Sequence, residues 1–442
     1  MEPEKVIVIG AGLAGCEAAW QIARLGVPVE LIEMKPHKRS PAHHIPEFAE
    51  LVCSNSFRSN QLENGVGLLK EELRILDSLL IEAADQTQVP AGGALAVDRA
   101  SFSNYVTQKI KEHPLIAICE KEMTYIPENV LTIIATGPLT DGAIFDEIGK
   151  LTDLKRLHFF DAAAPIIAAD SINRDIVFSM SRYGKGGADY LNCPMNEAEY
   201  ERFYEALITA ELAEVENFDK EVVFEGCMPI ETMAKRGRDA IRFGPLKPVG
   251  LIDPRTEKMP YACVQLRQDD KIASMFNLVG FQTRLRFPEQ KRVFQMIPGL
   301  ENANFYRYGV MHRNTYLHSP GFLNKDYSLK GDGNLYFAGQ MTGVEGYVES
   351  IGSGYIAGLS AGLTILGHNI DFPFSRKTML GAMAEYISDS AVTRFQPMNA
   401  NFGLVCPLDT KVKGKKERNL AYAQRAIEET KQIKNFLTPF YS

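Results

Sequence analysis

The first thirty-three residues constrain the fold of this chain more than any other segment does. Residues 5–9 form an apolar, β-branched run that is typical of a buried strand. A glycine-rich turn at 10–15 follows and leads into a helical pattern over 16–25. A second apolar strand over 27–33 ends at Glu33. The order of strand, glycine turn, helix, strand and acid predicts a dinucleotide-binding β-α-β unit.

The glycines of this turn have the spacing Gly-x-Gly-x-x-Gly, and each has a physical role. Gly10 permits the tight turn, Gly12 lets a pyrophosphate approach the backbone, and Gly15 allows close packing of helix and strand. The start of the helix then offers N–H groups and the positive end of its dipole to the phosphates. Glu33 is placed to accept hydrogen bonds from an adenosine ribose. We therefore predict cofactor contacts from Gly10, Ala11, Gly12, Gly15 and Glu33.

Two later segments identify the dinucleotide as FAD. Residues 334–340 form a strand and a turn with Gly339 and Gln340, and helical sequence follows over 352–362. This part resembles the second flavin-contacting segment of glutathione-reductase-like flavoproteins, in which Asp usually stands where this chain has Gln340. Residues 130–137 resemble the strand and Ala-Thr-Gly turn of the same fold. The predicted fold class is α/β, with a Rossmann-like, glutathione-reductase-like FAD-binding domain.

The middle of the chain carries a different kind of sequence. No second Gly-x-Gly-x-x-Gly follows a strand between 140 and 320, so a dedicated NAD(P)H domain is not expected. The region instead mixes an acidic helix with short strands and Gly and Pro turns. We predict an inserted α+β substrate domain that begins between about 150 and 200 and ends near 320. With the division placed at 196, it covers 196–320, between two parts of the FAD-binding domain at 1–195 and 321–442. The last part ends in a basic amphipathic helix.

Charge is unevenly distributed along the chain. The net charge is −7, yet residues 233–292 contain 13 Lys and Arg against 6 acidic residues, and residues 405–442 contain 8 against 4. Such regions suit contacts with phosphates, although a single basic residue is more often ordinary solvated surface. The candidate phosphate-binding residues are Lys235, Arg236, Arg238, Arg284 and Arg286.

Composition excludes several other classes of protein. Apolar residues make up 45% and charged residues 23%, as in ordinary globular proteins. No apolar run reaches the roughly 20 residues that a membrane helix needs, and the first one is too short and glycine-rich for a signal peptide. We expect a cytoplasmic protein without a membrane partner.

Two of the seven cysteines stand out by their surroundings. The cysteines are odd in number and scattered without a Cys-x-x-Cys pair, which argues against disulfides and a thiolate metal site, and no metal is expected. Cys53 lies in a polar loop with Arg58 nearby, and Cys227 lies between Gly and Pro just before the basic run at 235–238. Nearby cations favour a reactive thiolate, but a free cysteine is also a common small hydrophobe. The residues alone leave both readings open.

Five segments together resemble one known family across essentially the whole chain. They are residues 10–19, 51–56, 224–231, 309–316 and 339–347. They resemble the folate- and FAD-dependent tRNA (uracil-5-)-methyltransferases. The larger GidA/MnmG flavoproteins share the N-terminal fingerprint but carry a long C-terminal region that has no counterpart here.

The resemblance implies a reaction and roles for particular residues. It implies transfer of a methylene from 5,10-methylenetetrahydrofolate to C5 of the T-loop uridine at position 54 of tRNA, and its reduction by FAD that NADPH or NADH regenerates. The two family cysteines match Cys53 and Cys227; we assign Cys227 as nucleophile and Cys53 as partner acid or base, with the swap open. His312 could stack on the pterin or be structural. Tyr347 is a weaker stacking candidate and could equally serve packing.

Two other functions remain in view at this point. One is an FAD-containing reductase of small molecules or disulfides, against which the absence of Cys-x-x-Cys and of a second nucleotide fingerprint counts. The other is a non-catalytic tRNA-binding or folding factor that retains FAD. The choice between NADPH and NADH and the oligomeric state do not follow from the sequence.

Overall fold

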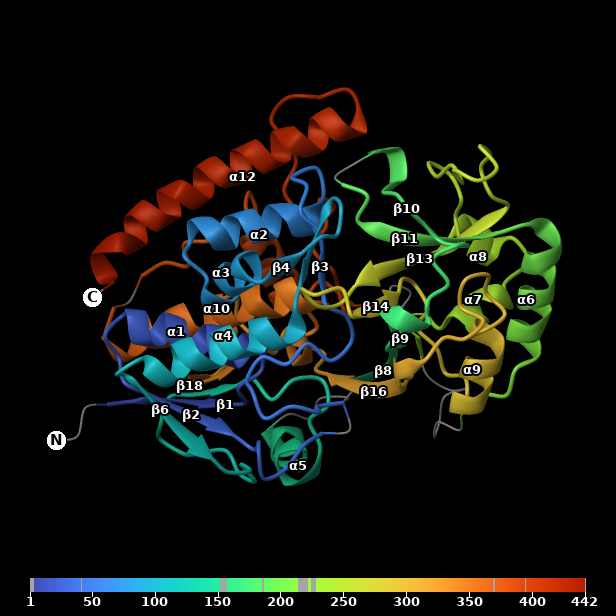
Figure 1. Cartoon of the computed structure of the whole chain (residues 1–442). Helices are drawn as coiled ribbons and strands as arrows, with labels where there is room; N and C mark the ends of the chain where they lie inside the picture. The colour runs from blue at the N-terminus through green and yellow to red at the C-terminus, as the bar shows by residue number, and fades with distance from the viewer. Residues whose placement is uncertain are drawn as a thin grey trace.

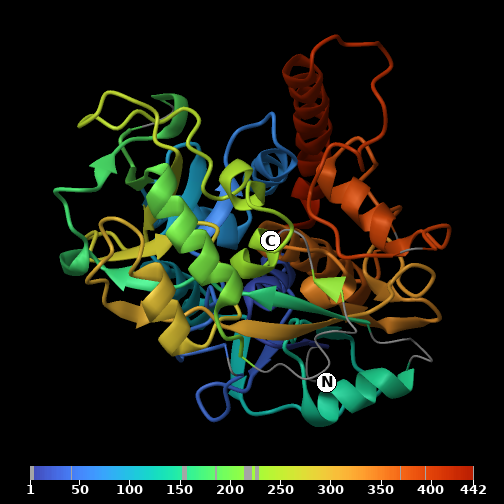
Figure 2. The same ribbon diagram turned by 90° about the vertical axis from the view of Figure 1, so that its right-hand side faces the viewer.

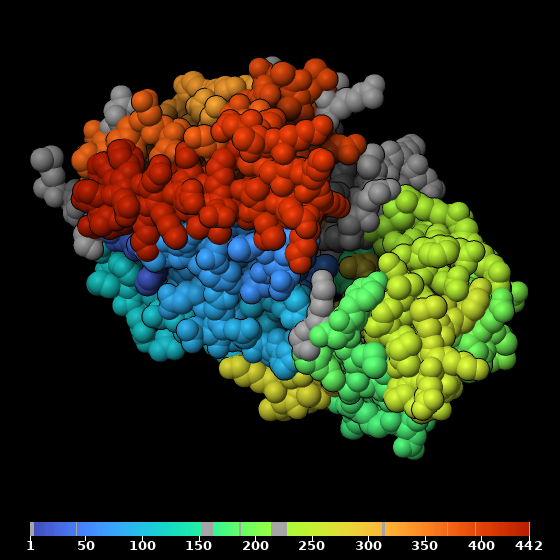
Figure 3. All heavy atoms as spheres, turned by 90° about the horizontal axis from the view of Figure 1, so that it is seen from above, coloured from blue at the N-terminus to red at the C-terminus, as the bar shows by residue number. Residues whose placement is uncertain are grey.

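The chain folds into two units that lie side by side (Figure 1). The structure, a computed structural model, describes residues 4–40, 42–151, 157–184, 187–213, 222–223, 228–368, 370–393 and 395–441. For residues 157–161, 222–223, 312 and 313 it describes the backbone only. The N-terminal and C-terminal segments form one mass, and the middle of the chain, green and yellow, forms the other (Figure 3).

A six-stranded sheet is the centre of the first unit. Its strands in spatial order are β17 (Ser328–Leu329), β18 (Asp332–Phe337), β7 (Thr132–Ile134), β1 (Val6–Ile9), β2 (Val29–Glu33) and β6 (Ile116–Glu120). The five strands from β18 to β6 are parallel, and β17 pairs antiparallel at the edge. All four residues of β1 are buried, as expected for a strand covered on both faces. The α/β, Rossmann-like fold class is thus confirmed.

Helices from distant parts of the sequence pack together with this sheet in the first unit. They are α1 (Leu13–Arg24), α2 (Gly65–Ile75), α3 (Leu79–Gln86), α4 (Arg99–Glu112), α5 (Gly142–Leu151), α10 (Tyr347–Ile365), α11 (Met379–Ser388) and α12 (Lys415–Leu437). Helices α1 and α10 lie on one face, and α5 lies on the other (Figure 1). Figures 1 and 2 show α12 along the outside of the unit, where it packs against α2.

The two central helices approach each other unusually closely. A Cβ atom on Gly354 would lie 2.2 Å from the Ala14 carbonyl oxygen, and one on Gly358 would lie 2.5 Å from that of Ala18. Only glycine permits this backbone contact. It presses α10, from the end of the chain, onto α1, from its beginning, and so closes the first unit around its core.

The second unit is built on an antiparallel sheet. Its strands in spatial order are β10 (Phe178–Ser179), β11 (Tyr190–Met195), β13 (Ala262–Gln268), β14 (Met275–Leu278), β9 (Ile166–Ala168) and β15 (Phe305–Arg307). In the described part of this unit, the helices beside the sheet are α6 (Glu197–Thr209), α7 (Ile230–Ala234), α8 (Ala240–Phe243) and α9 (Phe287–Phe294). The unit has its own hydrophobic core, separate from that of the first.

Strand pairing favours an earlier start for the inserted unit than the division at residue 196, within the predicted interval of 150 to 200. Strands β9, β10 and β11 all precede residue 196 and belong to the second sheet, in which β11 pairs with β13 and β9 pairs with β14. The division at 196 follows the start of the acidic helical sequence, which is a local feature. The pairing of β9 with β14 joins segments that are more than 100 residues apart in the sequence. We therefore propose that the inserted unit begins near residue 163 and ends near residue 310.

Two small sheets connect the units. One contains β12 (Val222–Val223), β8 (Leu157–Ala162) and β16 (Met311–Tyr316), and the other contains β3 (Ser56–Ser59), β5 (Ala94–Val97) and β4 (Gln88–Val89). The second of these adjoins the 51–55 loop, which carries Cys53. No helix in the described ranges is both long and apolar enough to cross a bilayer.

Candidate cofactor groove and active site

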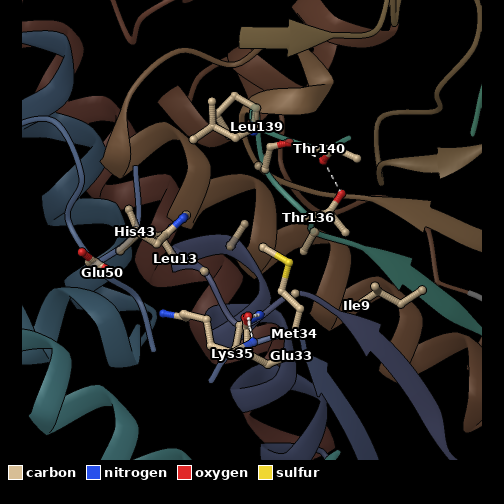
Figure 4. A pocket seen from close by; sticks show the side chains of 18 of the residues that line it. Ile9, Leu13, Glu33, Met34, Lys35, His43, Glu50, Thr136, Leu139 and Thr140 are labelled. Atoms are coloured by element: carbon tan, nitrogen blue, oxygen red, sulfur yellow. Dashed lines mark hydrogen bonds between the residues drawn. The ribbon is translucent and has the colours of Figure 1, made fainter. Parts of the chain in front are cut away.

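A groove crosses the carboxyl end of the parallel sheet, where ligands bind in open α/β sheets. It encloses about 1260 Å³, with its open mouth included. The glycine turn after β1, the end of β2, the turn after β7 and the turn after β18 all line it. Figure 4 shows Glu33, Met34 and Lys35 along one side and Thr136, Leu139 and Thr140 along the other.

The three glycines of the N-terminal turn differ in what surrounds them. Gly10 has a φ of +101°, and a Cβ there would lie 2.6 Å from the Ala135 carbonyl oxygen. A Cβ on Gly15 would lie 1.8 Å from the Gly10 carbonyl oxygen. A Cβ on Gly12, in contrast, meets nothing within 4 Å. The packing of the protein itself requires glycine at positions 10 and 15, whereas Gly12 leaves bare backbone that faces open space.

Gly12 is also the N-cap of α1, and no side chain caps that helix. The helix N-terminus therefore offers backbone donors and its positive dipole end where the groove passes. An open glycine, an uncapped helix start and a concave wall are the features that a dinucleotide pyrophosphate requires. The residues present fit FAD.

Glu33 lies at the end of β2 and is 6% exposed. Its two carboxylate oxygens accept hydrogen bonds from the backbone N–H groups of Ala11 (2.7 Å) and Lys35 (2.9 Å). The carboxylate thus ties β2 to the glycine turn. A carboxylate has about four acceptor positions, so Glu33 retains capacity for a ribose hydroxyl.

The other end of the groove is formed by the turn after β18. Gly339 has a φ of +84° and donates its N–H to Ser353 Oγ at 2.7 Å, which fixes the turn on α10. The Gln340 amide donates to Glu345 Oε2 at 2.6 Å. An Asp at this position, as in other flavoproteins, could only accept hydrogen bonds when ionised, whereas the Gln340 side chain donates one to the buried Glu345. Gln340 still lines the groove.

Tyr347 connects this end of the groove to Cys53. It begins α10, lines the groove, and its hydroxyl oxygen accepts the N–H groups of Cys53 (2.8 Å) and Ser54 (3.0 Å). Burial raises the pKa of the Tyr347 phenol. Its ring packs beside Phe57 with centroids 5.8 Å apart. Tyr347, which we had considered for stacking, thus holds the cysteine loop; a stacking role stays a prediction.

Cys53 is half-buried, with Sγ 3.8 Å from the Ala162 carbonyl oxygen at the end of β8. It lies where both units meet, because Arg267 of β13 donates to Ser54 Oγ and Arg307 of β15 donates to the Val52 carbonyl. Cys227 falls in residues 224–227, outside the described part of the chain. His312 lies in β16, which pairs with β8, and its imidazole is likewise outside the description.

The two predicted basic segments lie next to each other. Ile230 donates its N–H to the Gln282 carbonyl at 2.7 Å, and Glu231 accepts the Arg284 N–H at 2.8 Å. This places Lys235, Arg236 and Arg238 on the same unit as Arg284 and Arg286.

Their individual surroundings differ. Lys235 and Arg236 are exposed. Arg238 pairs with Glu197 at 3.1 Å and with Glu201, and Arg286 pairs with Glu211 at 2.9 Å. A phosphate would therefore compete with acidic partners at Arg238 and Arg286. Their role in binding RNA stays a prediction.

Three arginines around Cys53 were not predicted from the sequence. They are Arg99 at the start of α4, Arg267 in β13 and Arg307 in β15. A usable signal existed only for Arg267, because a single charged residue within an otherwise uncharged strand indicates a buried, paired group. Among the described residues, no group of three or more His, Cys, Asp or Glu side chains could hold a metal ion.

Comparison with known proteins agrees with this fold and site. The family model described as "Glucose inhibited division protein A" matches residues 5–369. A crystal structure of Aquifex aeolicus GidA superposes with a TM-score of 0.69 at 16% identity, covering 98% of this chain and 74% of that one. At that identity the likeness shows the fold alone. The fold and the groove thus define a GidA-type flavoprotein.

Similarity to enzymes of known name extends over the full length of the chain. "Methylenetetrahydrofolate--tRNA-(uracil-5-)-methyltransferase TrmFO" of Acetivibrio thermocellus is 59% identical over 96% of this chain and 97% of its own length. Proteins of the same name from Listeria monocytogenes and Bacillus velezensis are 58% and 56% identical, over 97% and 98% of this chain and 99% of their own lengths. The chain belongs to the TrmFO family.

Proposed function

We propose that this chain methylates C5 of the T-loop uridine at position 54 of tRNA, with 5,10-methylenetetrahydrofolate as the carbon donor. The family membership supports the activity. The structural observation that carries it is the position of Cys53, which Tyr347 holds at the flavin end of a dinucleotide groove. Bound FAD in its reduced form supplies a hydride there, and NADPH or NADH restores it.

The chemistry of uracil explains why thiols are needed beside a flavin. C5 is a weak nucleophile until a thiolate adds to C6, which forms a C–S bond and an enolate. The enolate carbon attacks the methylene of the donor, a base takes the C5 proton, and the C–N bond to tetrahydrofolate breaks, which leaves an exocyclic methylene on the thiol-bound ring. Addition of a hydride to this methylene completes the methyl group, while the C–S bond breaks and releases the thiolate. We assign the addition to Cys227 and the proton removal to Cys53, with the reversed assignment as the alternative.

The target base must leave its stack to reach a groove at this depth. The inserted unit, which presents Lys235 and Arg236 on its surface, is suited to hold the RNA backbone while the base enters. His312, in the strand that adjoins the Cys53 region, is the candidate to pack on the pterin. A tRNA substrate implies a cytoplasmic enzyme.

Transfer of labelled carbon from methylenetetrahydrofolate to a T-loop transcript tests this function. We expect label in the wild-type transcript and none in one that carries cytidine at the target position. A reductase would consume nicotinamide without labelling RNA, and a non-catalytic factor would bind RNA without either reaction. Either result would contradict the proposal.

A 5-fluorouracil transcript separates the roles of the two thiols. Fluorine takes the place of the departing C5 proton and cannot leave as a cation, so the protein–RNA adduct should persist in a denaturing gel. Cys227→Ala should abolish the adduct, and Cys53→Ala should retain the adduct but lose turnover. An adduct that persists in Cys227→Ala but is lost in Cys53→Ala would mean that the two roles are exchanged. Full turnover in both variants would contradict the covalent mechanism.

A further inference from the structure

Three arginines hold the loop on both sides of Cys53. Arg99 donates to the Leu51 carbonyl, and Arg307 donates to the Val52 carbonyl. On the other side, Arg267 donates to Ser54 Oγ at 2.8 Å and to Asn55 Oδ1 at 3.0 Å. Leu51, Val52, Ser54 and Asn55, on both sides of Cys53, thus each accept a hydrogen bond from a guanidinium.

These arginines come from both units of the fold. Arg99 begins α4 in the first unit, whereas Arg267 and Arg307 lie in β13 and β15 of the inserted sheet. Asn55 also donates to the Gln268 carbonyl at 3.0 Å. The inserted unit is therefore fastened to the Cys53 loop itself, so that the position of Cys53 depends on both units.

Among the described residues, the balance of charge around the Cys53 loop is positive. The charged or titratable groups that face Cys53 include Arg99, Arg267, Arg307 and Tyr347, and Asp269 lies beside the three arginines. Asp269, 2% exposed, pairs with Arg99 at 3.0 Å. One carboxylate thus faces three guanidinium groups, and Tyr347 stays neutral because burial raises its pKa.

A surplus of cations has a definite chemical effect on a thiol. Burial lowers the pKa of both Arg267 and Arg307, which shows that their charge is held in a poorly solvated place. In such a place a charge acts on its neighbours more strongly than in water. Cations beside a cysteine favour the thiolate over the thiol.

We propose that Arg307 and Arg99 are positioning residues that fix the Cys53 loop and favour its thiolate, and that Asp269 limits the strength of their field. The relevance to catalysis rests on the proposed function of Cys53. The effect of the arginine charges on the Cys53 thiol does not depend on the proposed function, because it is a property of the folded protein. The inference assigns to the inserted unit a direct part in the chemistry of a cysteine that belongs to the other unit.

The pH dependence of Cys53 alkylation in the FAD-bound enzyme tests the proposal. Iodoacetamide labelling of the Cys53 peptide is followed by mass spectrometry, which separates it from the other cysteines. Arg307→Met should raise the midpoint by about one pH unit, which makes labelling below the midpoint about tenfold slower. Arg307→Lys retains the charge, and its midpoint should lie between those of the wild type and Arg307→Met. Arg255→Met, which removes an arginine paired with Asp253 in the same unit, should leave the midpoint unchanged.

Asp269→Asn provides a test with the opposite sign. Asparagine is of similar size and can still accept from Arg99, but it removes the negative charge, so the midpoint should move to lower pH. A purely structural role would not shift the midpoint in opposite directions in the two variants. An unchanged midpoint in Arg307→Met with FAD retained, or an upward shift in Asp269→Asn, would overturn the proposal. If Arg307→Met fails to bind FAD, Arg307→Lys and Asp269→Asn decide, and no outcome depends on methyl transfer.

Discussion

Replacing Gly12 by alanine should separate cofactor binding from folding. Gly12 has φ −77° and ψ −168°, which alanine adopts freely, and a Cβ there meets nothing within 4 Å. Alanine reduces the entropy of the unfolded chain, worth about 0.4–1 kcal/mol. Its poorer N-capping opposes this by about 1 kcal/mol. The free energy of unfolding of the apoprotein should therefore change by no more than about 1 kcal/mol.

Binding of FAD should respond much more strongly. The new methyl group occupies the space through which a pyrophosphate reaches the start of α1, and loss of one charge-assisted hydrogen bond there costs about 1.5–3 kcal/mol. This corresponds to about 10- to 150-fold weaker FAD binding. Titration of the apoprotein with FAD, followed by flavin fluorescence, measures the affinity, and urea unfolding without FAD measures the stability.

Gly15→Ala is the matched control from the same turn. Its Cβ would lie 1.8 Å from the Gly10 carbonyl oxygen, so the helix or the turn has to move. Overpacking of this kind costs at least about 1–3 kcal/mol, and the apoprotein itself should lose stability. Native FAD affinity in Gly12→Ala, or equal destabilisation of the apoprotein by both variants, would refute the placement of the pyrophosphate at Gly12.

Three further outcomes follow from the structure. Burial lowers the pKa of Lys70 from its ordinary 10.5 to about 7, so between these pH values the unfolded chain binds more protons than the folded protein. The free energy of unfolding of the wild type, compared with that of Lys70→Met in urea titrations, should therefore rise with pH over this interval. Binding of tRNA should weaken as salt rises, and Lys235→Gln with Arg236→Gln should reduce the logarithmic slope by about 0.7–0.9 per lost phosphate contact; an unchanged slope would leave both residues as plain surface. His312→Ala should raise the KM for folate more than it lowers FAD content, with partial recovery in His312→Phe, whereas loss of FAD would indicate a structural role.

Much of the groove could be predicted because its determinants are local. The sequence of residues 5–33 contains the strand, the turn glycines and Glu33, and the structure places them along one groove. Helix α1 begins earlier than the helical pattern suggested, at Leu13, because the turn residues after Gly12 already adopt helical backbone. Helix α10 likewise begins at Tyr347, before the small-residue stretch that first indicated it.

The surroundings of Cys53 could not be predicted in the same way. Arg99, Arg267 and Tyr347, which hold the loop, are 48 or more positions away from the residues that they contact. Sequence periodicity reports which face of an element is buried but not which residues meet across two units. For the same reason the division at residue 196 groups β9 and β11 with the first unit, although their pairing partners β14 and β13 lie beyond that residue.

The fate of the carbon and hydrogen atoms tests the central claim most directly. The enzyme is incubated with a T-loop transcript, a reduced nicotinamide and methylenetetrahydrofolate that carries two deuterium atoms on its methylene carbon, and the RNA is digested and analysed by mass spectrometry. The account predicts 5-methyluridine at the T-loop position with both deuterium atoms in its methyl group and a third hydrogen that did not come from the donor methylene. Unmodified uridine, or a methyl group without deuterium, would contradict it.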